Sequence, residues 1–186
     1  MSDDIDYGPL TGLIGKWSGA KGLDIAPEPD GAEKNAYYET ITFEAIGDVT
    51  NAESQVLVAL HYRQIVSRKS TDKVFHDETG YWMWDVTQGV IMHSLMIPRA
   101  VSVLAGGAHD NQQMDDGSTV LQVSASIDDL NWQIIQSPFM RDNAKTTRFE
   151  HKITVGGESL SYFETTTVDI YGKIFEHTDK NTLLRQ

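Results

Sequence analysis

Apolar and polar residues alternate with a period of two through most of this chain, and this pattern limits what the chain can fold into. β-branched and aromatic residues, as in Thr40-Ile41-Thr42-Phe43 and Thr165-Thr166-Thr167-Val168, favour half-buried strands. The pattern predicts an all-β protein. Turn-forming residues separate ten such segments, which lie near residues 16–25, 37–46, 54–66, 74–84, 89–97, 101–105, 118–127, 148–155, 160–170 and 174–185.

The segments between the expected strands carry turn and loop signals. Residues 9–14 are apolar and predict a short turn or helix, and Gly156-Gly157 indicates a hairpin. Two stretches rich in charged and turn-forming residues, 26–36 and 110–117, are expected to be exposed loops. For residues 137–142, a short helix and a loop crossing are both open.

About ten meandering antiparallel strands close most economically into a single barrel, because closure removes unpaired strand edges. A barrel wider than about eight strands leaves internal room, so we expect a ligand cavity. A two-sheet sandwich has the same periodicity and is the alternative. With 186 residues, 40% of them hydrophobic, residues 1–186 are expected to form one domain, with a flexible acidic tail at residues 1–8.

Composition excludes several classes of function. The net charge of −12 opposes binding to nucleic acid and to anionic membrane surfaces. No apolar run approaches the roughly 20 residues of a membrane helix, and the acidic start Met1-Ser2-Asp3-Asp4 does not resemble a signal peptide, so we expect a cytoplasmic protein. The chain has no cysteine, so any metal ligand has to come from histidine or carboxylate side chains.

Three blocks of sequence resemble the nitrobindin family of haem-binding β-barrels. The segment Gly15–Gly22 is similar to the glycine-rich opening of that family, and His76–Trp82 is similar to its internal His-x-Glu-Ser-Gly-aromatic segment. His177 falls on the last strand, where the family places the imidazole that coordinates haem iron. Trp17 near the start and Arg185 near the end also resemble the cation–π pair that closes lipocalins and fatty-acid-binding proteins.

The resemblance implies a lipocalin-like or fatty-acid-binding-protein-like barrel that binds haem b, with His177 as the iron ligand. It also implies binding of nitric oxide or handling of reactive nitrogen species, and for some relatives isomerisation of peroxynitrite. Whether the chain is an enzyme stays open, as does its oligomeric state, for which a homodimer is one option. Residues Phe175, His177 and Asp179 share one face of the expected strand, so Phe175 is placed to pack a macrocycle that His177 binds. Alternatively, His177 only makes a hydrogen bond near the strand end.

Two further residues are candidates for the pocket. His76 is expected near it, either polarising a bound molecule or in a structural role beside Glu78 on the same face. Arg99 follows a proline at an expected strand end, and a guanidinium pointing inward would clamp a carboxylate of a haem propionate or a fatty acid. The second hypothesis is therefore a haem-free carrier of a small hydrophobic acid, anchored by Arg99. His61, His93 and His151 lack metal-site spacing and are expected to be ordinary barrel histidines.

Overall fold

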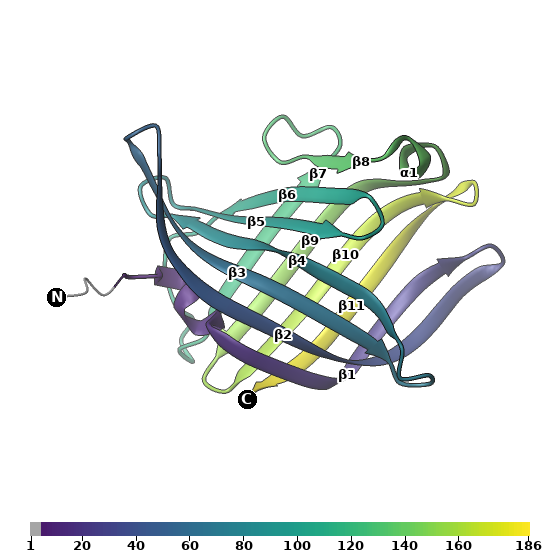
Figure 1. The fold of residues 1–186 in the computed structure, drawn as a ribbon, viewed down its shortest axis with the longest axis horizontal. Helices are drawn as coiled ribbons and strands as arrows, with labels where there is room; N and C mark the ends of the chain where they lie inside the picture. Colours follow the sequence, from purple (N-terminus) through teal and green to yellow (C-terminus); the bar gives the residue numbers. More distant parts are fainter. Residues whose placement is uncertain (1–4) are drawn as a thin grey trace.

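Ten antiparallel strands close into a ring in the computed structural model, which describes residues 5–186 (Figure 1). Around the ring the order is the first six strands in sequence, then β7, β9, β10 and β11, which pairs with β1. This closure confirms the predicted barrel and excludes the sandwich. The elements are η1 (Gly8–Leu13), β1 (Gly15–Glu28), β2 (Gly31–Asn51), β3 (Gln55–Arg68), β4 (Val74–Asp85), β5 (Val90–Ile97), β6 (Val101–Ala108), β7 (Thr119–Ser126), β8 (Ile134–Gln136), α1 (Pro138–Asn143), β9 (Ala144–Gly156), β10 (Ser159–Ile170) and β11 (Lys173–Arg185).

Strand pairing around the ring is weakest between β6 and β7, which share one paired position, Gly106 opposite Ser124. The short strand β8, which the sequence pattern did not predict, pairs instead with residues 101–103 of β6. The indole of Trp132 packs so close to Gly106 that an added Cβ would lie 2.3 Å from it. A segment outside the ten-strand ring thus supports the ring where two of its members diverge.

The short helix η1 covers one end of the barrel, at the left in Figure 1. Leu10 and Leu13 on this helix are fully buried, and the indole N–H of Trp17 donates a hydrogen bond to the Leu13 carbonyl over 2.7 Å. The guanidinium carbon of Arg185 lies 4.2 Å from the centre of the Trp17 ring. The predicted cation–π contact is therefore confirmed, and this end of the barrel is closed.

The expectation of an exposed loop at residues 26–36 is wrong. β1 continues to Glu28 and β2 begins at Gly31, so the two strands form a long hairpin with a two-residue turn. The pairing of β1 with β11 ends at Ile25, so Pro27 lies where β1 has a neighbour on one side only. Proline is tolerated at such edge positions because its missing N–H removes no hydrogen bond there.

Most of the other connecting segments have the structure that the sequence predicted. Residues 137–142 contain a helix, α1, and the Ser137 hydroxyl accepts a hydrogen bond from the Met140 N–H at its start. Residues 110–117 contain no helix or strand. Of the expected tail, residues 1–4 lie outside the described part, whereas the Tyr7 hydroxyl accepts a hydrogen bond from the Gly47 N–H over 2.8 Å. Within residues 5–186, no helix is both long enough and apolar enough to span a membrane.

Candidate functional site

The half of the barrel away from η1 encloses a cavity of about 390 Å³. Its walls come from both long hairpins, β1–β2 and β10–β11, together with the β5–β6 turn and α1, which lie toward the right in Figure 1. Small-molecule sites in proteins usually have volumes of roughly 300–1,000 Å³. The fold therefore supplies the ligand cavity that the expected width of the barrel predicted.

One wall of the cavity is apolar. It is built by inward-facing side chains of the strands from β3 to β6 and of β9 and β10, with a methionine from α1. Together these side chains form an apolar surface that suits a flat apolar ligand, although the same strands also carry Arg68, Glu78 and Glu164 into the cavity. Its members include Val66, Phe75, Leu95, Ile97, Val101, Val103, Met140, Phe149, Val168 and Ile170.

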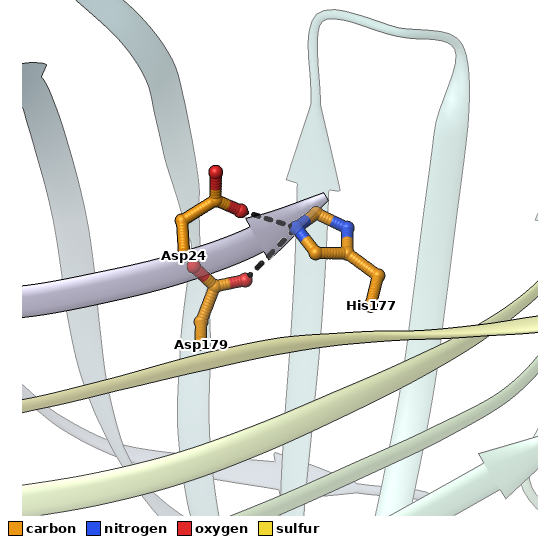
Figure 2. A group of neighbouring side chains, drawn as sticks. All are labelled: Asp24, His177 and Asp179. Atoms are coloured by element: carbon orange, nitrogen blue, oxygen red, sulfur yellow. Dashed lines mark hydrogen bonds and ion pairs between the residues drawn. The ribbon is translucent and has the colours of Figure 1, made fainter. Parts of the chain in front are cut away.

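The facing wall carries Asp24, His177 and Asp179 (Figure 2). Asp24 on β1 is directly opposite Asp179 on β11 in the strand register, and His177 precedes Asp179 by two positions on the same face. The Nε2 atom of His177 lies 2.6 Å from Asp24 Oδ1 and 3.3 Å from Asp179 Oδ2. His177 therefore makes a hydrogen bond to Asp24 across the β1–β11 pair.

Burial and neighbouring charges shift the pKa values of His177 and Asp179 in opposite directions. Burial lowers the pKa of His177, but its hydrogen bond to Asp24 and the negative charge of Asp179 outweigh this effect, so its pKa lies above the usual value. Burial raises the pKa of Asp179 to about 6, although the neighbouring His177 opposes this rise. A protonated His177 therefore neutralises part of the negative charge on this wall.

A chain of hydrogen bonds leads from the cavity into the core. His76 lines the cavity, and its Nε2 lies 3.3 Å from Glu78 Oε2. The Tyr62 hydroxyl donates to the other oxygen of Glu78, and His93 Nε2 lies 2.8 Å from the same hydroxyl. Burial alone would raise the pKa of Glu78, but His76, His93 and Tyr62 lower it. Glu78 is thus a buried anion whose charge His76 balances at the cavity wall.

A second buried carboxyl, Glu39, lies behind two residues that line the cavity, Gln64 and Tyr162. It accepts hydrogen bonds from Gln64 Nε2 over 2.8 Å, from the Tyr162 hydroxyl over 3.0 Å and from Asn181 Nδ2 over 2.8 Å. Burial raises the pKa of Glu39 to about 7, even though these three hydrogen bonds lower it. Since Gln64 and Tyr162 line the cavity, this network holds these two side chains of the cavity wall in place.

The structure brings three of the four sequence candidates to the cavity. His177, His76 and Arg99 line it, and Arg99 extends from the exposed β5–β6 turn. Phe175 is half-buried on the cavity-facing side of β11 but is not among the lining residues. The aromatic rings on the cavity wall instead belong to Phe75, Phe149, Tyr162 and Tyr171.

Asp24 was not predicted from the sequence as a site residue, and Asp179 was predicted only to share a face with His177. The signal for Asp24 is its place in the strand register, because a carboxylate directly opposite another on neighbouring strands is unfavourable without a compensating charge. That register depends on a bulge between Ser18 and Leu23. An irregularity of this kind cannot be located from alternation alone.

Comparisons with known proteins agree with this fold. The family model described as "THAP4-like, heme-binding beta-barrel domain" matches residues 6–185. The crystal structure of Rv2717c from M. tuberculosis is similar, with a TM-score of 0.67 and 20% sequence identity over 98% of this chain and 99% of that chain. At this identity the similarity concerns the fold. No curated protein gives a significant match to the sequence.

Proposed function

Because the chain belongs to the THAP4-like, haem-binding β-barrel domain family, we propose that its cavity binds haem b for the uptake of nitric oxide or other reactive nitrogen species. Haem is the cofactor of this family. The observation that carries the proposal is an imidazole, His177, on the wall of a cavity that many apolar side chains also line.

The residues of the cavity fit this group. A macrocycle needs an apolar surface, and the wall around Leu95, Val103 and Phe149 provides one. Two propionates need cations, and Arg68 and Arg99 line the cavity. Arg68 also pairs with Glu33 over 3.3 Å, whereas no acidic group of the described residues lies within ion-pair distance of Arg99.

His177 would hold the iron. Its Nε2 is held by Asp24, and the described residues offer Nδ1 no hydrogen-bond partner, which leaves Nδ1 for a metal. A carboxylate on one ring nitrogen orients an imidazole ligand and raises its basicity. When bound, haem would supply the iron at which a diatomic molecule or an oxidised nitrogen species reacts. His76, beside Glu78 on the cavity wall, is placed to donate a hydrogen bond to such a molecule.

The test is a titration of purified apoprotein with haemin, followed by its Soret absorption. His61 is the matched control, because it is also a strand histidine but is paired with Glu44 on the outer surface. We expect saturable one-to-one binding with an imidazole-type spectrum in the wild type and in His61→Ala, and loss of that spectrum in His177→Ala. Weak, featureless binding that is equal in all three proteins would refute the proposal. A positive result leads to titration of the reduced form with nitric oxide.

A small hydrophobic acid is the second candidate ligand, and the position of Arg99 favours it. Its guanidinium is at the cavity mouth, next to apolar side chains such as Ile97 and Val101. Lipids extracted from purified wild-type protein should then be lost in Arg99→Ala while the circular dichroism spectrum is unchanged. Retention of the same lipids by both proteins would reject Arg99 as the anchor.

A further inference from the structure

The cavity wall has more negative than positive side chains. Two arginines line it, whereas six acidic residues do so: Asp24, Glu28, Glu33, Glu78, Glu164 and Asp179. Part of this excess is removed by Arg68, by the two histidines on the wall and by burial of Glu164, which raises the pKa of that carboxyl well above its usual value. The remaining excess makes the cavity attractive to a cation.

The negative charge is most concentrated where Asp24 faces Asp179 across the β1–β11 pair. The Asp24 side chain is only 3% exposed and that of Asp179 is 26% exposed. Like charges directly opposite each other on neighbouring strands destabilise a sheet, and burial increases the cost. A folded chain that keeps this pair favours a positive charge beside the two carboxylates, which either a protonated His177 or a bound cation supplies.

The three side chains in Figure 2 lie close enough together to share one metal ion. One oxygen of Asp24, one oxygen of Asp179 and Nε2 of His177 all lie within 4.8 Å of one another. First-row divalent cations bind nitrogen and oxygen ligands at about 2.0–2.2 Å, which separates the ligand atoms by roughly 3.0–3.5 Å. The distance of 3.3 Å from Nε2 to Asp179 Oδ2 lies in this range, whereas the 2.6 Å to Asp24 Oδ1 is that of a hydrogen bond, which would lengthen when a metal replaces the proton.

We propose that Asp24, Asp179 and Nε2 of His177 bind a divalent first-row transition-metal cation directly, without haem. Two carboxylates and a neutral imidazole balance a charge of +2, and the imidazole favours zinc or iron(II) over calcium or magnesium, while the two carboxylates also suit manganese. On binding, Nε2 loses its proton to solvent and a metal–nitrogen bond takes its place. The amide N–H of Asn35 donates to Asp24 Oδ2 over 2.7 Å and holds this carboxylate in place.

The cation would keep open coordination positions. His177 and Asp179 both line the cavity, so a bound ion is in contact with the space that a second ligand would occupy. Three protein ligands with an open position are typical of catalytic rather than structural metal sites. This inference goes beyond the haem proposal, because it uses the two carboxylates and the other nitrogen of the His177 ring.

The experiment uses protein freed of metal by a chelator and then titrated with ZnCl₂ or MnCl₂ in a calorimeter. The variants are Asp179→Asn, Asp24→Asn and His177→Ala. The matched control is Asp169→Asn, which removes an exposed carboxylate from the outer face of the neighbouring strand β10. We expect one ion per chain in the wild type and in the control, with affinity at least about tenfold weaker in each of the three site variants. Asp179→Asn is the decisive variant, because its side chain is the more exposed of the two carboxylates and its loss is least disruptive to folding.

Haemin titration of the same proteins separates this inference from the haem proposal. Asp179→Asn should lose the cation and still take up haemin, whereas His177→Ala should lose both. Cation binding in a wild type that takes up no haemin would leave the metal site standing and overturn the haem proposal. Absence of cation binding in the wild type, or equal affinity in the wild type and Asp179→Asn, would overturn the metal site whatever the haemin result.

Discussion

Replacing Arg185 should weaken the closed end of the barrel without altering the cavity. Its guanidinium lies over Trp17 and donates hydrogen bonds to the carbonyls of Ile14 and, over 2.8 Å, of Gly12. A partly buried cation–π contact contributes about 1 kcal/mol, and each of the two hydrogen bonds contributes on the order of 1 kcal/mol. Arg185→Met keeps most of the apolar contact with the ring, so we expect it to lower the free energy of unfolding by about 3 kcal/mol.

Urea unfolding at pH 7, followed by tryptophan fluorescence, measures this loss as a change in midpoint at constant slope. Arg185→Lys should fall between the wild type and Arg185→Met, because a lysine keeps the charge but cannot donate to both carbonyls in the same fork. The control is Arg141→Met, which removes an exposed pair with Asp142 and should cost no more than about 0.5 kcal/mol. If Arg185→Met costs no more than this control, the contact with Trp17 does not hold the closed end in place.

Three further substitutions test the buried networks and the close packing of the strands. Burial raises the pKa of Glu39 from 4.5 to about 7, so its contribution to stability is present below pH 4.5 and lost as pH rises through 7. Urea unfolding at pH 5 and pH 8 should therefore show a smaller loss of stability with rising pH in Glu39→Gln than in the wild type, the difference being on the order of 3 kcal/mol. Tyr62→Phe removes the hydroxyl that Glu78 and His93 share, so we expect urea unfolding to show a loss of about 2 kcal/mol in the free energy of unfolding. The control Tyr38→Phe removes an exposed hydroxyl and should lower the free energy of unfolding by less than about 0.5 kcal/mol. Gly80→Ala would place a Cβ 1.9 Å from the Ser94 carbonyl oxygen on the paired strand, so we expect a fall in melting temperature of about 10 °C or more, and an unchanged melting temperature would contradict this geometry.

Much of the barrel follows from local patterns. Alternation predicted the ten strands of the ring, because each strand has one face toward the interior and the other toward solvent. It missed β8, whose three residues are too short to show a period. It also placed a loop at residues 26–36, because Pro27 and its neighbours resemble turn residues unless the strand is known to be at an edge there.

The candidate site was predictable in part. His177, His76 and Arg99 were chosen from the sequence and all line the cavity. Asp24 could not be chosen in the same way, because it is 153 residues from His177 along the chain. Only a defined register between the first and last strands, including its bulge, places these two side chains together.

Local sequence patterns are enough to assign the all-β class of the fold and the types of side chain that can bind a metal. Its alternation requires an inner and an outer face, and its lack of cysteine leaves histidine and carboxylates as the metal ligands. Which of these groups meet depends on the folded barrel, since closure of the ring pairs β1 with β11 and brings Asp24 against His177 and Asp179. Periodicity fixes the face on which a residue lies, whereas strand register and barrel closure fix its neighbours.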